Sequence, residues 1–326
     1  MMTRILSYRP IQLILTTLII LGALICVFTP NYLLFKIGAS FANQIMMAYL
    51  GLGLLFLVLK QHKLTFTCFA CCGCLCLFLK FYSNWEWPVP VDPGETMEVA
   101  LDVAHFNIAT SNDDYETTIN SILASDADII SLQEVTPDWH DFLQESLLEH
   151  YPHSTSFVSM DPYGLAIYSK RKIIDVDTFF FENIPNLHIK VNARIKGQPI
   201  SIISSYTMPP LYQSALVKLK EHMKTIATYA KEIEQPVITV GDYNAPPWFE
   251  EVRLLMQNAQ LEDSRSMGNQ GLDNLFQYPI DYILYSGHLH CSDFQILTSP
   301  NTSHFGIKGA YKFNTDFVKD AQKTIQ

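Results

Sequence analysis

An acid and an amide stand two residues apart, directly after a buried-strand pattern in the second half of the chain. Asp242 and Asn244 follow the apolar run 236–240, and only Gly241 separates that run from the acid. Glycine allows the tight backbone geometry that such a corner needs. Here a carboxylate can orient or deprotonate water, and an amide can donate a hydrogen bond to a phosphate oxygen. An Asx turn uses the same residue types, so the pair alone indicates either a turn or a reactive site.

Two oxygen-bearing side chains earlier in the chain are the ligands that a hard cation prefers. Asn107 ends the predicted strand 99–108, and Glu134 lies just beyond the buried run 128–132. Mg²⁺ binds a few protein oxygens together with water and substrate oxygens, and it neutralises phosphate charge. We therefore predict that Glu134 and Asn107 are metal ligands. Taken singly, Glu134 is typical of a surface residue and Asn107 of a turn.

A histidine and an aspartate near the C-terminus form a third pair. His304 precedes the predicted strand 306–313, and Asp281 begins the predicted strand 281–285. A carboxylate that bonds to an imidazole fixes its tautomer and stabilises its cation. Such a pair can protonate a leaving oxygen or stabilise the negative transition state. A histidine alone is typically an ordinary surface or core residue, but the three pairs together indicate hydrolysis of a phosphoester.

The elements that must position these residues begin near residue 97. Short β-rich runs alternate with helical patterns, and the long helix predicted at 211–233 leads into the strand that ends at Asp242. Two runs, 189–195 and 200–206, are strands joined by a short turn, which breaks the strict alternation of a doubly wound sheet. The pattern favours two packed sheets with helices on the outside.

Seven segments between about Met97 and Phe313 carry a family resemblance in their order, spacing and strand context. They are His105-Phe106-Asn107, 130–135, 164–169, 205–210, 241–244, 280–284 and Ser303-His304. With them the sequence resembles the endonuclease/exonuclease/phosphatase superfamily, including its bacterial membrane-anchored members. The resemblance implies an α/β fold, a four-layer sandwich of two central β-sheets flanked by helices, with an Mg²⁺ or Mn²⁺ site.

The resemblance also implies roles for individual residues. Asn107 and Glu134 would hold the metal, Asp242 would align or activate water, Asn244 would contact phosphate, and His304 would pair with Asp281. Tyr206 stands where many relatives have histidine. The apurinic endonuclease branch has tyrosine there, which assigns Tyr206 to the phosphate as a further catalytic residue.

Ser303 departs from the family pattern, which usually has an aspartate before the final histidine. Serine supplies no negative charge to a metal or to the imidazole. If the aspartate acts from outside the ligand set, its loss lowers metal affinity or activity about 10–100-fold. If it is a direct ligand, the protein is a weakened or inactive relative.

Three segments near the N-terminus contain no charged residue: 10–35, 37–59 and 64–79. The first two exceed the roughly 20 residues that a helix needs to cross a bilayer, and lysines beside the shorter third segment can snorkel. A cleaved signal peptide is the alternative for the first segment, but its apolar core is usually only about 7–15 residues. We therefore predict an all-α membrane region at 1–84 with about three transmembrane helices, a linker rich in proline at 85–96, and a catalytic domain at 97–326.

Basic residues predict the orientation, because short cytoplasmic loops are enriched in them. Along three spans they are arranged as Arg4 and Arg9, then Lys36, then Lys60 and Lys63, then Lys80. This pattern predicts an integral protein of a bacterial inner membrane with its catalytic domain on the periplasmic (exoplasmic) side. If the third segment only dips into the interface, the domain lies in the cytoplasm instead.

Charge narrows the substrate class. Residues 88–326 hold 31 Asp and Glu and 16 Lys and Arg, a net charge of −15. Nucleic-acid binding depends mainly on Lys and Arg, so this balance disfavours it. We predict a membrane-anchored, metal-dependent phosphoesterase that acts on a lipid headgroup or a small phosphoester. The alternatives are an endonuclease or exonuclease acting on DNA, which Tyr206 favours, and a catalytically weakened interaction module anchored in the membrane, which Ser303 favours.

Overall fold

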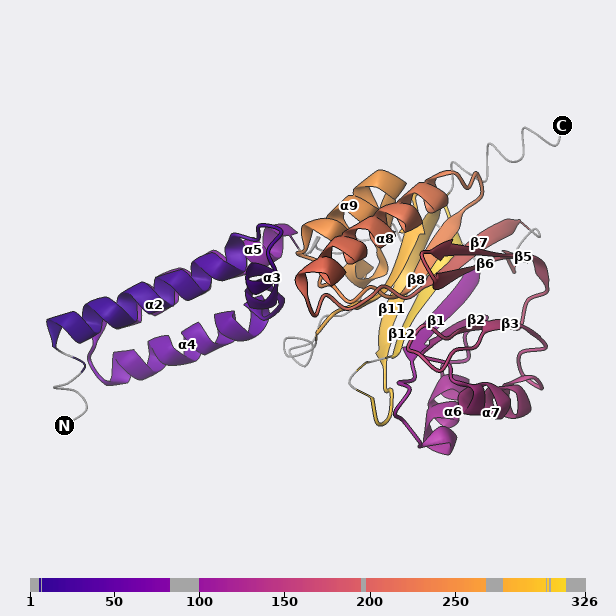
Figure 1. The fold of residues 1–326 in the computed structure, drawn as a ribbon, viewed down its shortest axis with the longest axis horizontal. Helices are drawn as coiled ribbons and strands as arrows, with labels where there is room; N and C mark the ends of the chain where they lie inside the picture. Colours follow the sequence, from indigo (N-terminus) through magenta and orange to yellow (C-terminus); the bar gives the residue numbers. More distant parts are fainter. Residues whose placement is uncertain are drawn as a thin grey trace, which may run out of the picture.

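The N-terminal part of the chain is a set of apolar helices that project from one end of an α/β domain (Figure 1). The computed structural model describes residues 6, 8–82, 100–194, 198–267, 278–302, 304 and 306–314. The predicted linker at 85–96 therefore lies outside the described residues. The helices are α2 (Arg9–Val27), α3 (Leu33–Ser40), α4 (Ala42–Val58) and α5 (His62–Tyr82).

Two of these helices are long and apolar enough to cross a membrane. At about 1.5 Å per residue, the 19 residues of α2 and the 21 residues of α5 match roughly 30 Å of hydrocarbon. Helices α3 and α4 are bent by 60° at their junction, and they make a third span if the bent pair counts as one. The structure thus has two helices that could cross a membrane, or up to three if each bent pair is one span. The predicted number of about three spans stays a prediction, and α3 is a separate short helix.

The described residues form two six-stranded sheets at the centre of the domain. The first has the order β11-β12-β1-β2-β4-β3, with β1 (Leu101–Asn107), β2 (Ile129–Gln133), β3 (His153–Phe157), β4 (Leu165–Ser169), β11 (Leu289–Leu297) and β12 (Gly306–Phe313). The second has the order β5-β6-β7-β8-β10-β9, with β5 (Ile173–Phe181), β6 (Ile184–Asn192), β7 (Pro199–Ser205), β8 (Val237–Asp242), β9 (Leu261–Asp263) and β10 (Asp281–Ser286).

Helices cover the outer faces of both sheets. Helices α6 (Tyr115–Ala124) and α7 (Pro137–Leu147) pack on the first sheet, and α8 (Gln213–Lys231) and α9 (Glu250–Ala259) on the second. Between the sheets, buried aliphatic side chains of both inner faces form one cluster, including Ile129 and Ile167 from one sheet and Ile202 and Val240 from the other. The order helix, sheet, sheet, helix confirms the predicted four-layer α/β sandwich.

Strand pairing gathers several strand ends at one edge of the sandwich. The parallel pair β1–β2 sets Asn107 opposite Gln133, one residue before Glu134. The antiparallel pair β8–β10 sets Asp242 opposite Asp281. The last residues of β1, β2 and β8 and the first residue of β10 thus share one end of the two sheets.

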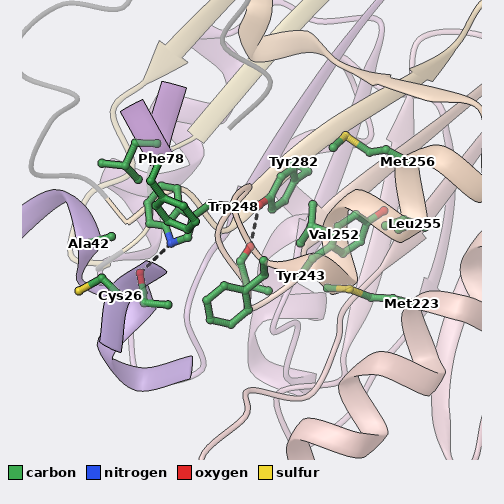
Figure 2. Close-up of a cluster of buried hydrophobic side chains, with 14 of the residues drawn as sticks. Cys26, Ala42, Phe78, Met223, Tyr243, Trp248, Val252, Leu255, Met256 and Tyr282 are labelled. Carbon is green, nitrogen blue, oxygen red and sulfur yellow. Dashed lines mark hydrogen bonds between the residues drawn. The ribbon is translucent and has the colours of Figure 1, made fainter. Parts of the chain in front are cut away.

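Helix α3 docks on the α8–α9 layer through a buried ion pair. Lys36 Nζ lies 2.7 Å from Glu251 Oε2, and each side chain is only 1% exposed. Trp248 Nε1 donates a hydrogen bond of 2.7 Å to the backbone oxygen of Ala39. Figure 2 shows Trp248 beside Phe78 of the helical region, within a cluster that continues to the domain. The helices and the domain therefore share one hydrophobic core.

Replacing Lys36 by methionine is expected to destabilise the protein by about 3–5 kcal/mol, because it leaves the Glu251 carboxylate buried without its partner. The double substitution Lys36→Met with Glu251→Leu removes both charges and is expected to recover most of that stability. Thermal unfolding of the full chain in detergent measures both variants. Equal losses in the single and the double variant would contradict this role of the pair.

Candidate active site

Asp281 lies between two histidines at the start of β10. His105 Nε2 is 3.2 Å from Asp281 Oδ1, and His304 Nδ1 is 3.0 Å from Asp281 Oδ2. Burial alone would raise the pKa of Asp281, but hydrogen bonds with His105 and His304 outweigh it and hold that pKa at about 2. Asp281 is therefore an anion that orients His304. The structure brings this predicted pair into contact, and its catalytic role stays a prediction. His105 was not assigned a role from the sequence, because only the packing of β1 against β10 brings it to this carboxylate.

Asp242, across the strand pair from Asp281, is 1% exposed. Its Oδ2 lies 3.9 Å from His304 Nδ1, and its Oδ1 accepts a hydrogen bond of 2.8 Å from the backbone of Asn244. Burial, and then the negative charge of Asp281, raise the pKa of Asp242 well above its ordinary value. This pocket holds more negative charge than its protein groups neutralise, which favours a bound cation.

His304 carries positive charge in this arrangement. Burial lowers its pKa, but the hydrogen bond with Asp281 and the charges of Asp281 and Asp242 dominate, and the pKa of His304 is raised to about 9. An imidazolium at this place can stabilise negative oxygens or give a proton to one. Ser303, the residue before it, lies outside the described residues, and the carboxylate that His304 contacts comes from Asp281 instead.

The pKa values predict how stability depends on pH in the metal-free protein. The ordinary pKa of His304 is 6.5 and its folded value is about 9, so its stabilising contribution is complete below pH 6.5 and is lost as the pH rises through 9. The contribution of Asp281 is complete above pH 3.8 and is lost as the pH falls through about 2. With a chelator present, the free energy of unfolding of the wild type should exceed that of His304→Gln by on the order of 3 kcal/mol between pH 3.8 and pH 6.5. The two free energies should converge above pH 9, and thermal unfolding measures both. A difference that grows with rising pH would contradict the assignment.

Asn107 and Glu134 meet beside these residues. Asn107 Nδ2 donates to Glu134 Oε1 at 3.0 Å, and it lies 3.4 Å from both Asp242 Oδ2 and His304 Nε2. The other oxygen of Glu134 accepts hydrogen bonds from the backbone and hydroxyl groups of Thr110, at 2.8 and 3.2 Å. Glu134 has a φ of 65°, so the chain turns sharply as β2 ends. Thr110 was not predicted to be a site residue, because it lies in a loop where the sequence has no recognisable pattern.

Gln133 ties the two sheets together beneath the site. Its Nε2 donates to the Ser205 backbone oxygen at 2.6 Å, and its Oε1 accepts from the Asp242 backbone at 2.8 Å. Gly241 has a φ of 149°, and a Cβ there would lie 1.9 Å from the Ser205 oxygen. Only glycine fits this close approach. The corner that presents Asp242 is thus fixed by groups from both sheets.

Tyr206 and Asn244 border the acids. Tyr206 is buried and hydrogen-bonds Asn244; burial, and then the charges of Asp242 and Glu134, raise the pKa of its phenol. Tyr206 therefore stays protonated and can donate a hydrogen bond. Asn244 Nδ2 also donates to the Thr207 backbone oxygen at 2.8 Å, which holds the amide against the neighbouring loop.

The pocket offers a fitting set of ligands for a divalent cation. One atom each from Asp242, Asp281 and His304 lies within 4.8 Å of the other two, and Asn107 Nδ2 donates a hydrogen bond to Glu134 beside them. The carboxylate oxygens of this group can bind a cation while His304 stays protonated. Buried carboxylates with unneutralised charge suit a hard ion such as Mg²⁺ or Mn²⁺. The metal-binding roles predicted for Glu134 and Asn107 stay predictions. The structure brings all seven predicted site residues to the same edge and adds His105, Thr110 and Gln133.

A four-layer α/β sandwich with acids, amides and a histidine at one sheet edge defines the class of this protein. Residues 104–304 match the endonuclease/exonuclease/phosphatase family. Because the match spans more than half of the chain, the protein belongs to that family, as its motifs predicted. Members of this family are phosphoesterases or nucleases, and its enzymes generally use divalent metal ions.

Solved structures share the fold at low sequence identity. The human Nocturnin catalytic domain with bound sulfate has 18% identity and a TM-score of 0.53, covering 66% of this chain and 95% of that one. A mannosyl-6-phosphatase from Bacteroides thetaiotaomicron VPI-5482 has 15% identity and a TM-score of 0.53, covering 66% and 100%. TDP2 from D. rerio, complexed with single-strand DNA product, has 15% identity and a TM-score of 0.52, covering 66% and 100%. No curated protein matches the sequence significantly.

Proposed function

We propose that the protein is a membrane-anchored, divalent-metal-dependent phosphoesterase that hydrolyses a phosphodiester or phosphomonoester, in a lipid headgroup or a small molecule. One observation carries the proposal above all. Asp242, Asp281 and His304 converge within 4.8 Å, and Asn107 joins Glu134 to them. Metal-assisted hydrolysis of phosphoesters needs this combination of acids, an imidazolium and amide donors.

Each residue has a task that follows from its environment. Bound Mg²⁺ or Mn²⁺, held by Glu134 and the neighbouring acids, would neutralise phosphate oxygens. Asp242 orients the attacking water and accepts its proton. His304, held by Asp281, stabilises the negative oxygens or protonates the leaving one. Tyr206 and Asn244 donate hydrogen bonds to the phosphate.

The membrane anchor consists of α2, the α3–α4 pair and α5. The turn between α4 and α5, with Lys60 and Lys63, lies at the far end of these helices, as does the start of α2 (Figure 1). Lys36 lies at the end next to the domain, where Glu251 pairs with it. With basic residues favouring the cytoplasm, this arrangement supports a bacterial inner-membrane protein whose domain faces the periplasm.

A nuclease is the second candidate, because Tyr206 and the TDP2 structure with its DNA product favour it. The net charge of −15 in residues 88–326 opposes it. The third candidate is an interaction module that lost activity when serine took position 303. The contact of His304 with Asp281 opposes that candidate, because a carboxylate still orients the imidazole.

A substrate panel separates these functions. The full chain in nanodiscs is incubated with Mg²⁺ or Mn²⁺ and, in turn, phospholipid, bis-(p-nitrophenyl) phosphate, p-nitrophenyl phosphate, plasmid DNA and single-stranded DNA. Asp242→Ala is the control. We expect hydrolysis of the phospholipid or the small esters, lost in the control. Faster cleavage of DNA would establish the nuclease, and absence of turnover together with absence of divalent-ion binding would establish the interaction module.

A further inference from the structure

Helix α3 has two faces of different kinds. Lys36 and Ala39 are buried against the catalytic domain, where they contact Glu251 and Trp248. The residues on the opposite face are apolar and exposed: Leu34 at 70%, Ile37 at 48% and Phe41 at 51%. Their spacing of three and four residues places them on one stripe of a helix. One face of α3 is thus held against the catalytic domain, and its opposite, apolar face is exposed. A second apolar surface is needed to cover that exposed face.

The catalytic domain adds exposed apolar residues at the same end. Leu211 is 75% exposed and Tyr212 is 53% exposed, in the segment just before α8. The next residue, Gln213, accepts a hydrogen bond of 2.9 Å from the Leu33 backbone and donates one of 2.7 Å to the Asn31 backbone. Leu211 and Tyr212 therefore lie next to the connection between α2 and α3. We call the set Leu34, Ile37, Phe41, Leu211 and Tyr212 the footprint.

The footprint lies near the side of the active site where Asn244 is held. Thr207, whose backbone oxygen binds Asn244, is four residues before Leu211, which limits their separation to about 14 Å. On the other side, Tyr278 hydrogen-bonds Ser40 of α3 and is near enough to Asp242 to respond to its charge. Contacts from two directions thus connect the site to the end of the membrane helices.

A lipid bilayer is the partner that fits this surface. The footprint adjoins α2 and α4, which in turn pack against α5. Outward apolar side chains of these three helices, such as Leu18, Leu54 and Leu77, are also exposed in the chain alone. A surface continuous with such helices meets the headgroup and acyl boundary when they are embedded. Tyr212 suits this boundary because its ring is apolar and its hydroxyl is polar.

We propose that the footprint rests in the bilayer interface and holds the Asn244 side of the active site close to it, so that the phosphate to be cleaved is carried by a lipid of the same membrane. The lipid substrate rests on the proposed phosphoesterase function, whereas membrane contact of the footprint does not. A free small phosphoester would reach the same pocket from water, and the experiments below separate the two sources.

Depth-dependent fluorescence quenching tests the membrane contact without any need for activity. The full chain with Leu211→Trp is placed in nanodiscs of phosphatidylcholine, with or without brominated acyl chains. The tryptophan fluorescence of the wild type is subtracted from that of the variant, which leaves the emission of the added tryptophan. Val176→Trp is the control, because Val176 is exposed on β5, far from the membrane helices (Figure 1). We expect strong quenching for Leu211→Trp and none for the control. Equal quenching of the two would overturn the proposal.

Turnover tests the lipid source of the phosphate. The variant Leu34→Gln with Leu211→Gln, which changes two exposed side chains, should lower hydrolysis of a phospholipid in the nanodisc about 10-fold. Hydrolysis of bis-(p-nitrophenyl) phosphate by this double variant should change less than about twofold. Hydrolysis of either substrate by the Val176→Gln control should also change less than about twofold. Equal losses on both substrates, or loss on neither, would overturn the lipid assignment. If wild type hydrolyses nothing, the proposed function fails, while the quenching result still decides whether the footprint meets lipid.

Discussion

Replacing Asp242 by asparagine is expected to lower kcat for phosphoester hydrolysis by about 10²–10⁴-fold, because the amide cannot accept a proton from water. The backbone corner at Asp242 is held by Gln133 and Gly241 rather than by the carboxylate's charge. Asparagine keeps an oxygen to accept the Asn244 backbone hydrogen bond. The loss should therefore be chemical and not a loss of fold.

Stability distinguishes this effect from a structural one. Burial and Asp281 disfavour the Asp242 anion in the metal-free protein, so Asp242→Asn should unfold at the same temperature as wild type or higher when a chelator is present. Asp141→Asn, whose side chain is 90% exposed, is the matched control and should keep full activity. A parallel fall of activity and melting temperature in Asp242→Asn would contradict the catalytic role.

Removing divalent ions is expected to have an effect of similar size. A metal that stabilises transition-state charge supplies several kcal/mol, so chelation should reduce turnover about 10³-fold, and added Mg²⁺ or Mn²⁺ should restore it. Glu134→Gln should raise the metal concentration needed for half-maximal rate at least about 100-fold, because even partners outside the ligand set cost about 10–100-fold. Its hydrogen bonds from Asn107 and Thr110 show that Glu134 is already held in the pocket.

Metal titration of turnover in the full chain provides the measurement. Glu149→Gln, an exposed acid after α7, serves as the matched control and should show the wild-type metal dependence. Full activity in excess chelator would exclude the metal role altogether. An unchanged half-maximal concentration in Glu134→Gln would remove Glu134 from the ligand set while leaving the other acids.

Strong local patterns made much of the fold predictable. The apolar run before Asp242 indicated β8, and the helical pattern at 211–233 indicated α8, which the structure places at Gln213–Lys231. Strand β11 (Leu289–Leu297) was missed because polar residues interrupt its edge position, and β5 was missed for a similar reason, with four consecutive exposed residues. Patterns identify elements well where one face is buried and poorly at sheet edges.

Contacts between distant segments account for what the sequence could not reveal. His105 reaches Asp281 only because two sheets pack face to face, and 176 positions separate the pair. Lys36 was interpreted as a loop charge that reports membrane orientation, whereas the structure also shows it buried against Glu251, 215 positions away. Glu251 itself resembles an ordinary acid in the first turn of a helix.

Anomalous diffraction from crystals of the full chain grown with Mn²⁺ tests directly whether these residues form one metal site. We expect a single strong peak in the pocket, about 2.0–2.3 Å from a carboxylate oxygen of Glu134 and from at least one carboxylate oxygen of Asp242 or Asp281. A pocket without a peak, at Mn²⁺ concentrations that support turnover, would contradict the account.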